Sequence, residues 1–229
     1  MTKPTETALH KALTSVINEH NQVFVNLKRE DLIKHTIENR EALVSKNGAL
    51  ATWTPPESTG RSPKDTYIVR RASSEANIDW TSPNNIQIDE QIFDMVFSDA
   101  LNSLWKHDKV YITERVIGAD SKYALPVKTI TTQALTALFS DNMFRPVPKD
   151  IKKSLFANRD FQLLTVPYEK LDSKKYKGQL RLMPNGDGSD VAVIMDMDRR
   201  LGVIVGSAYL GSVKKLMFTV MNYYLPFEG

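Results

Sequence analysis

Helix-like and strand-like segments follow one another in an irregular order along this chain, and that order limits the folds open to it. Residues 88–105 form the clearest helix, because apolar residues from Ile88 to Trp105 recur every three or four positions. Further helices are predicted at 7–17 (with Thr5 or Thr7 as the cap), 29–37, 132–139, 148–156 and 211–224. Alternating or short apolar runs predict strands at 49–53, 66–70, 109–116, 125–131, 161–166, 190–196 and 201–205.

Several of these strands are neighbours in sequence, whereas others are separated by helices. A pure repeat of strand, helix and strand would give an all-parallel sheet, so this order favours a mixed one. We therefore expect an α/β fold, with a single compact domain in which helices flank a mixed β-sheet.

Helical spacing also predicts which side chains face the core. The face of the helix near Arg29 is expected to carry Leu32, Ile33 and Ile37. In the first and last helices, the residues expected to point inward are Leu9, Leu13, Val16, Ile17, Val213, Leu216, Met217, Val220 and Met221.

Composition excludes several classes of protein. Of the 229 residues 41% are hydrophobic, which is enough to supply a core. There is no Cys, so a disulfide scaffold, a Cys-based zinc site and a Cys nucleophile are ruled out. The net charge of +3 is spread along the chain, which argues against nucleic-acid binding. No apolar run is long enough to cross a membrane, and a cytoplasmic location is the expectation.

The stretch TGRSPKD, residues 59–65, is the first with a pattern that suggests chemistry. Gly60 permits a sharp turn and Pro63 stiffens it, so Arg61 can be held in one direction between two strands. A fixed guanidinium binds a carboxylate or phosphate through two parallel hydrogen bonds. The alternative is an ordinary exposed polar turn.

The stretch GSAYLGSVKK, residues 206–215, is the second. It follows an apolar strand and opens a helix, where backbone N–H groups attract anions. Tyr209 lies in the turn, and Lys214 and Lys215 lie in the first helical turn, where cations oppose the helix dipole. Such a conflict suggests a functional site. The alternative is a solvated pair of lysines at a helix end.

Other signatures are absent or point to structure. Gly206 and Gly211 have the spacing of a phosphate loop, but such a loop needs Lys and then Ser or Thr after its second glycine, and this chain has Ser212 and Val213 there. No residue is therefore assigned to a nucleotide or other cofactor. The four His residues have no metal-ligand spacing. Asp196 and Asp198 suit a hairpin better than a metal pair, and Gly186 and Gly188 suit a hairpin turn.

Together these stretches make the sequence resemble the N-terminal part of ATP-dependent phosphoenolpyruvate carboxykinase. The resemblance runs over residues 21–229, and the helix within residues 1–20 lies outside it. Its landmarks, in the order of the family, are FVNL (24–27), NGAL (47–50), TGRSPKD (59–65), GAD-x-KY (118–123), LPVKTIT (125–131), ALF-x-x-NMF-RP (137–146), Y-x-G-x-x-KK (209–215) and FTVMNYYLP (218–226).

The resemblance implies an activity and roles for the matching residues. The family interconverts oxaloacetate and phosphoenolpyruvate, a reaction of gluconeogenesis, using ATP and Mn²⁺ or Mg²⁺. It implies that Arg61 binds a substrate carboxylate and that Tyr209 lines the site. It also implies that Lys215 is a ligand of the divalent metal and that Lys214 neutralises phosphate and enolate charge.

Departures from the family pattern leave three hypotheses. The chain ends at Gly229, before the family's metal-binding His, its P-loop and its metal-binding Asp, and it carries Ser212 and Ala124 where Glu and Arg are usual. In the first hypothesis the chain is an N-terminal substrate-binding domain that is inactive alone. In the second it is a stand-alone binding or interaction protein without catalysis, and in the third it is one subunit of a split enzyme. The third hypothesis needs the P-loop half in trans. In each case the isolated chain is expected to show no turnover and to bind metal and ATP weakly or not at all.

Overall fold

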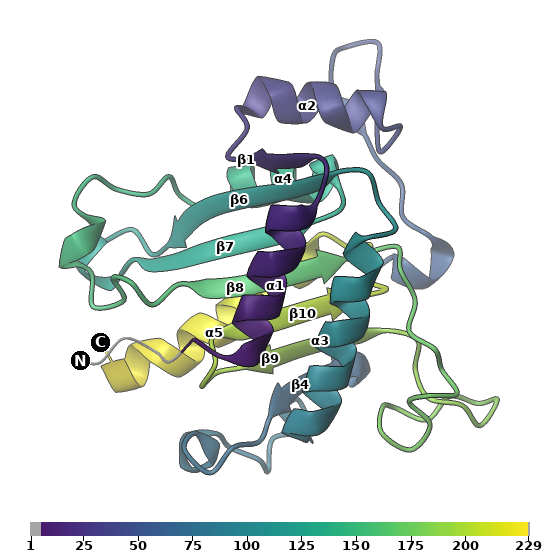
Figure 1. The fold of residues 1–229 in the computed structure, drawn as a ribbon, viewed down its shortest axis with the longest axis vertical. Helices are drawn as coiled ribbons and strands as arrows, with labels where there is room; N and C mark the ends of the chain where they lie inside the picture. Colours follow the sequence, from purple (N-terminus) through teal and green to yellow (C-terminus); the bar gives the residue numbers. More distant parts are fainter. Residues whose placement is uncertain (1–5, 229) are drawn as a thin grey trace.

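An eight-stranded mixed sheet forms the centre of the protein in a computed structural model that describes residues 6–228. Its strand order is β1-β6-β7-β8-β10-β9-β4-β5 (Figure 1). The strands are β1 (Val23–Val25), β4 (Thr66–Val69), β5 (Ile86–Ile88), β6 (Val110–Ile117), β7 (Leu125–Thr131), β8 (Phe161–Val166), β9 (Ala192–Asp196) and β10 (Leu201–Val205). The pairs β6–β7 and β10–β9 are antiparallel and the other five are parallel.

Helices cover both faces of the sheet (Figure 1). The helices are α1 (Ala8–Glu19), α2 (Arg29–Glu38), α3 (Glu90–Leu104), α4 (Ala134–Met143) and α5 (Gly211–Glu228). In the view of Figure 1, α1 and α3 lie in front of the sheet, α4 and α5 lie behind it, and α2 lies beyond the edge strand β1. A separate two-stranded hairpin, β2 (Leu43–Val44) with β3 (Leu50–Ala51), follows α2.

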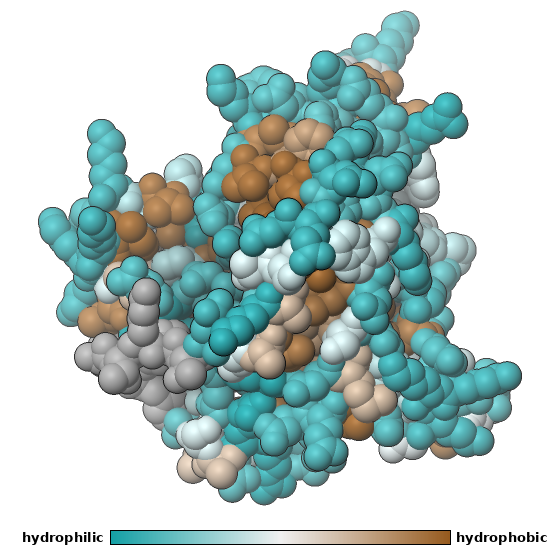
Figure 2. Space-filling model, in the orientation of Figure 1, coloured by the Kyte–Doolittle hydropathy of each residue, from teal (hydrophilic) through white to brown (hydrophobic). Residues whose placement is uncertain are grey.

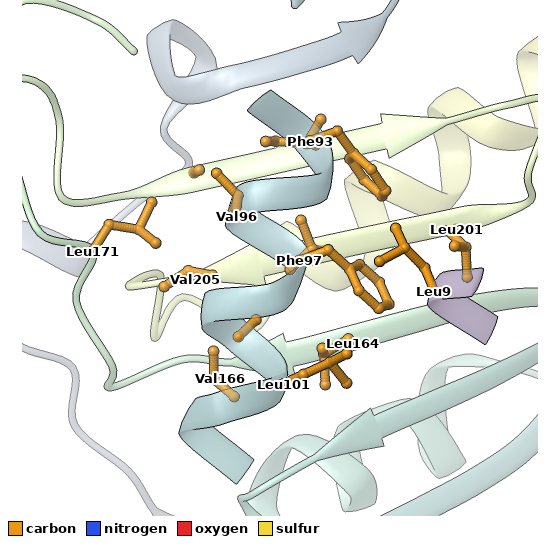
Figure 3. Close-up of a cluster of buried hydrophobic side chains, with 14 of the residues drawn as sticks. Leu9, Phe93, Val96, Phe97, Leu101, Leu164, Val166, Leu171, Leu201 and Val205 are labelled. Atoms are coloured by element: carbon orange, nitrogen blue, oxygen red, sulfur yellow. The ribbon is translucent and has the colours of Figure 1, made fainter. Parts of the chain in front are cut away.

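The larger core lies between the sheet and the two front helices. Phe93, Phe97 and Leu101 of α3 point onto the sheet and belong to the same buried cluster as Leu164 and Val205 (Figure 3). From outside, this same face of the protein is mainly hydrophilic, with an apolar patch where β1 lies (Figure 2). The helices thus bury one apolar stripe and present their polar side to water.

The second core lies between the sheet and α5. The inward residues predicted for the C-terminal helix, from Val213 to Met221, are all buried there, which confirms that prediction. Every residue of β9 and of β10 is buried, because a helix covers each of their faces. Gly202 of β10 makes room for this packing, since a Cβ there would lie 2.9 Å from the ring of Phe161.

The first helix belongs to the front core. Leu9 and Leu13 are buried in it, and Val16 and Ile17 pack against it. Thr7 is the N-cap, and its backbone N–H donates to Nδ1 of His10 at 3.3 Å. The alternative cap, Thr5, lies outside the described residues. The helix that lies outside the sequence resemblance is therefore packed with the rest of the domain.

Most predicted elements are present, and three strands have the predicted bounds. The predicted α/β fold with a mixed sheet and flanking helices is confirmed. The strands at 125–131, 161–166 and 201–205 match β7, β8 and β10, and an antiparallel hairpin joins β9 to β10. The predicted turn at Gly186 is also present, with its N–H bonded to the carbonyl of Met183.

Four predictions were wrong in detail. Ile88 ends strand β5, and α3 begins two residues later, with Asp89 as its N-cap. In α2 the buried partner of Leu32 is Thr36, whereas Ile37 is 38% exposed. The Thr36 hydroxyl can be buried because it donates to the carbonyl of Leu32 at 2.8 Å.

The other two errors concern short segments. The helix predicted at 148–156 is only a 3₁₀ turn, Ile151–Lys153, and the strand predicted at 49–53 shortens to β3. The short strands β1, β2 and β5 had not been predicted, because two or three residues carry too little alternation to be seen.

A buried carboxylate joins α2, β6 and α4. Arg115 of β6 and Arg29 of α2 both donate to Asp141 of α4, the latter at 2.8 Å. Burial alone would raise the pKa of the Asp141 carboxyl, but the hydrogen bonds from the two guanidinium groups outweigh it and lower that pKa. The ion pair therefore stabilises the fold only while Asp141 is ionised.

We expect Asp141→Asn to lower the free energy of unfolding by about 1–3 kcal/mol at neutral pH. Because the pKa of Asp141 is lowered in the fold, its contribution is complete above the ordinary carboxyl value of about 4. It is lost as the pH falls through the lower, folded value. Urea unfolding of both proteins from pH 7 to pH 2 should therefore show curves that converge in acid, and curves that stay parallel would contradict the expectation. The matched control is Asp31→Asn, which alters an exposed acid on α2.

Candidate functional site

One edge of the sheet collects the loops that carry the two singled-out motifs. Val205, the last residue of β10, pairs in parallel register with Val166, the last residue of β8. At the same edge β9 begins beside the start of β4, where Thr66 pairs with Val193. The loop before β4 and the loop after β10 therefore meet at the carboxyl ends of β8 and β10, on the right in Figure 1. Ligands of open α/β sheets bind outside such ends.

The loop that carries Arg61 is built from two 3₁₀ turns, η1 (Pro56–Ser58) and η2 (Pro63–Asp65). Arg61 lies between them and is exposed, and the carbonyl of Ser62 accepts from the backbone N–H of Asp65 at 3.0 Å. Gly60 permits the turn, as expected, but it is not needed there. Its φ is not positive and a Cβ there would meet nothing within 4 Å, so the turn does not require glycine.

Asp65, the last residue of the motif, is buried and paired. Its two carboxylate oxygens accept from Nε and Nη2 of Arg181 at 2.7 and 2.9 Å. The hydrogen bond to this carboxylate raises the pKa of the Arg181 guanidinium. The neighbouring Tyr67 hydroxyl accepts from the backbone N–H of Arg181 at 2.9 Å, and burial raises the pKa of Tyr67. The acid of the motif therefore has a structural partner.

The loop that carries Tyr209 requires glycine at position 206, and the ring of Tyr209 depends on glycine at position 211. Gly206 has φ +75°, and a Cβ there would lie 3.0 Å from the carbonyl oxygen of Asp190. At Gly211, where α5 begins, a Cβ would lie only 2.3 Å from Cε1 of Tyr209. The ring of Tyr209 therefore occupies the space that a side chain at position 211 would need. In the same loop the hydroxyl groups of Ser207 and Ser212 bond to each other at 2.9 Å.

One hydrogen bond joins the two loops, and an ion pair joins the Arg61 loop to the segment between β8 and β9. The backbone N–H of Ala208 donates to the hydroxyl of the buried Ser58 at 3.4 Å. Glu57 forms a long ion pair, 3.9 Å, with Lys170, which also lies 3.4 Å from Asp190. Motifs about 150 residues apart in the sequence are thus in contact.

A cavity of about 490 Å³ lies between the Arg61 loop and α5. Arg61 and Lys215 both line it, with amide and hydroxyl groups from residues such as Asn84, Ser212 and Asn222. The described residues of the lining include these two cations and no carboxylate. This donor set suits an anion, because each cation and each N–H or O–H group can donate to it.

The four predicted site residues divide into two pairs. The structure brings Arg61 and Lys215 together in the cavity, whereas Tyr209 and Lys214 are not among the described residues that line it. Lys214 is exposed on the first turn of α5, and Tyr209 is half-buried against Gly211. Nζ of Lys215 lies 4.7 Å from the ring centroid of Phe218, one turn further along α5.

Sequence reasoning missed several residues of the site. Phe218 and Asn222 share a helix face with Lys215, and their spacing of three and seven residues from it could have revealed them. Asn84 in the lining, and Arg181, which lies outside it and pairs with Asp65, come from distant segments, and no local signal marked them.

The remaining candidates are structural. Asp196 is fully buried and accepts from Nε of Arg71 and of Arg199 at 3.0 and 2.7 Å, as suits a hairpin. His35 contacts the hydroxyl of Tyr111. Among the side chains that the structure describes, no group of three or more His, Cys, Asp or Glu could hold a metal ion, and none of the described helices could span a membrane.

Fold and cavity define the class of this protein as an α/β domain with a cationic cavity at the edge of a mixed sheet. Residues 21–229 match the sequence profile of the phosphoenolpyruvate carboxykinase (ATP) family. The chain is 34% identical over 216 residues to the phosphoenolpyruvate carboxykinase (ATP) of Alkaliphilus oremlandii, which covers 94% of this chain and 38% of the relative.

Two further relatives with that name agree. The protein of Thermus thermophilus is 34% identical, over 93% of this chain and 38% of its own length. That of Bacillus subtilis is 32% identical, over 88% of this chain and 36% of its own length. The chain belongs to the ATP-dependent phosphoenolpyruvate carboxykinase family, and it spans less than two fifths of the length of these relatives.

Glycine at position 211 should be necessary for the position of Tyr209. We expect Gly211→Ala to displace the ring and to lower the free energy of unfolding by about 1–3 kcal/mol, as overpacking does. Aromatic ¹H–¹³C spectra and urea unfolding measure the two effects. The matched control is Gly60→Ala, since open space surrounds that position. A Tyr209 signal that moves no more in Gly211→Ala than in the control would contradict the expectation.

Proposed function

We propose that this chain is the substrate-binding part of an ATP-dependent phosphoenolpyruvate carboxykinase. The family relation makes oxaloacetate and phosphoenolpyruvate the candidate ligands. The observation that carries the proposal is the cavity in which Arg61 and Lys215 face one space without a carboxylate among its described lining. Both candidate ligands are small anions that carry a carboxylate.

Each predicted residue has a proposed task. The exposed guanidinium of Arg61 binds a substrate carboxylate in the two-pronged geometry that is specific to Arg. Lys215 offers a second positive charge from α5, and Lys214, on the same helical turn, neutralises charge that develops at the phosphate or enolate oxygen. Tyr209 lies against Gly211 at the start of α5, outside the described lining of the cavity, and its proposed task is to contact the carboxylate or the carbon dioxide that leaves.

The cavity by itself does not fit a divalent cation. Mn²⁺ and Mg²⁺ prefer carboxylate and other oxygen ligands, and Mn²⁺ also takes imidazole, whereas this lining offers an ammonium, a guanidinium, amides and hydroxyl groups. The residues that line the cavity therefore bind the anion and not a metal. The role of Lys215 as a metal ligand, implied by the resemblance, requires further ligands from outside residues 6–228.

ATP is likewise assigned to another part of the enzyme. Phosphoryl transfer depends on a phosphate-binding loop and on metal, and the sequence of this chain holds no such loop. We propose that these parts are supplied from outside the 229 residues, within the same polypeptide or by a second chain. The predicted cytoplasmic location stays a prediction.

One observation favours a second candidate, a carboxykinase-like binding protein without catalysis. Ser212 lines the cavity at the position where the family usually carries Glu, and its hydroxyl bonds to that of Ser207. The start of α5 therefore carries two neutral hydroxyl groups in place of the carboxylate that is usual in the family. The two candidates differ in one respect, since only the first predicts turnover when the rest of a carboxykinase is added.

We expect no ATP-dependent formation of phosphoenolpyruvate by the pure 229-residue chain, because it holds no phosphate-binding loop. Addition of the P-loop part of a family member should restore detectable turnover. Turnover by the pure chain would contradict the assignment of ATP to another part, and none after the addition would favour the binding protein.

Substrate binding itself is tested with oxalate, an analogue of the enolate. NMR titration of the chain should give saturable shifts for residues that line the cavity, and Arg61→Ala should weaken the affinity at least tenfold through loss of a charge-assisted pair. Lys64→Ala, which removes an exposed cation from the same loop, is the matched control. No shifts at millimolar oxalate, or an equal loss in both variants, would contradict the proposal.

A further inference from the structure

The segment between β8 and β9, residues 167–191, is fixed to the front of the domain. Leu171 and Leu180 belong to the front core. Tyr176 is fully buried, and its hydroxyl donates to Asp99 of α3 at 2.7 Å. The ammonium of Lys175 binds the same carboxylate at 2.7 Å. The segment therefore forms a fixed platform beside the edge of the sheet.

Arg181 extends from this platform to the Arg61 loop. Its guanidinium donates two parallel hydrogen bonds to Asp65, and its backbone N–H donates to Tyr67. The side chain of Asp65 is only 5% exposed. Two charge-assisted bonds of this kind fix direction as well as distance. Arg181 thereby fixes both the position and the direction of Asp65, the last residue of η2.

The backbone between Asp65 and Arg61 transmits that constraint. The carbonyl of Ser62, next to Arg61, accepts from the N–H of Asp65 at 3.0 Å and from the hydroxyl of Thr66 at 2.9 Å. Pro63 fixes φ at the start of the turn. Residues 62–66 are thus closed into one unit, and Arg61 directly precedes it.

We propose that Arg181 is a positioning residue for Arg61. Through Asp65 it holds residues 61–65 so that the guanidinium of Arg61 faces the cavity beside Lys215. Arg181 is not among the described residues that line the cavity, so it acts through the loop and not on the ligand. The positioning rests on the geometry alone, whereas its consequence for affinity rests on the proposed function.

The test is Arg181→Lys in the 229-residue chain, since an ammonium keeps the charge but cannot form the two parallel bonds. The loop should loosen, and the {¹H}–¹⁵N NOE of the amides at 60–62 and 64 should fall. If Arg61 then faces the cavity about a tenth of the time, the affinity for oxalate falls about tenfold. Arg199→Lys is the matched control, because it alters a guanidinium bound to Asp196 at the other end of β9.

A double variant separates positioning from a general loss of structure. In an Arg61→Ala background, Arg181→Lys should weaken oxalate binding no further. An additive loss would overturn the proposal, because Arg181 would then act without Arg61. Unchanged NOE values at 60–62 and 64 would overturn it whether or not oxalate binds.

The two proposals fail in different ways. If the unaltered chain does not bind oxalate, the proposed function fails while the NOE values still decide the role of Arg181. If Arg181→Lys does not fold, Asp65→Asn removes the charged partner of Arg181 with almost no change of shape. Asp65→Asn should lower the same NOE values, and values equal to those of the unaltered chain would overturn the proposal.

Discussion

Strand β9 decides where the candidate site forms. It pairs antiparallel with β10 on one side and parallel with β4 on the other, and all five of its residues are buried. These pairings bring the end of β10 and the start of β4 to the same edge of the sheet. The loops with Arg61 and Tyr209 meet there although β4 and β10 are far apart in sequence. A different register of β9 would separate them.

Several arginines of the domain are paired with buried acids. Arginines that face the sheet ends away from the cavity are paired with buried acids, as Arg71 and Arg199 are with Asp196. Arg181 at the cavity edge is paired in the same manner with Asp65. Arg61 forms no ion pair with any of the described side chains, which end at residue 226. We propose that the ligand of the cavity is the partner of this unmatched charge.

Sequence reasoning predicted the fold class because that depends on local patterns. Strands such as β7 and β8 were found with their bounds, since five to seven residues of apolar or alternating character are a sufficient signal. Ile88 was assigned to the wrong element because an apolar residue at a strand end also fits the stripe of the next helix. Strand order could not be predicted, since pairings such as β1 with β6 are made between distant segments.

The site was predictable only in part, for the same reason. Arg61 and Lys215 each stood in a motif with an unusual local feature, and the resemblance to the family supported both. That they line one cavity follows from the sheet and not from either motif. Arg181 had no local signal, because its importance comes from Asp65 more than one hundred residues away.

The central claim is that Arg61 and Lys215 together form one anion site. A crystal structure of the 229-residue chain grown with oxalate tests it most directly. The account predicts oxalate in the cavity, with a carboxylate held by both nitrogens of the Arg61 fork and the ammonium of Lys215 within hydrogen-bonding distance. A crystal in which the cavity is open to solvent and holds no oxalate, or in which Arg61 points away from a bound one, would contradict it.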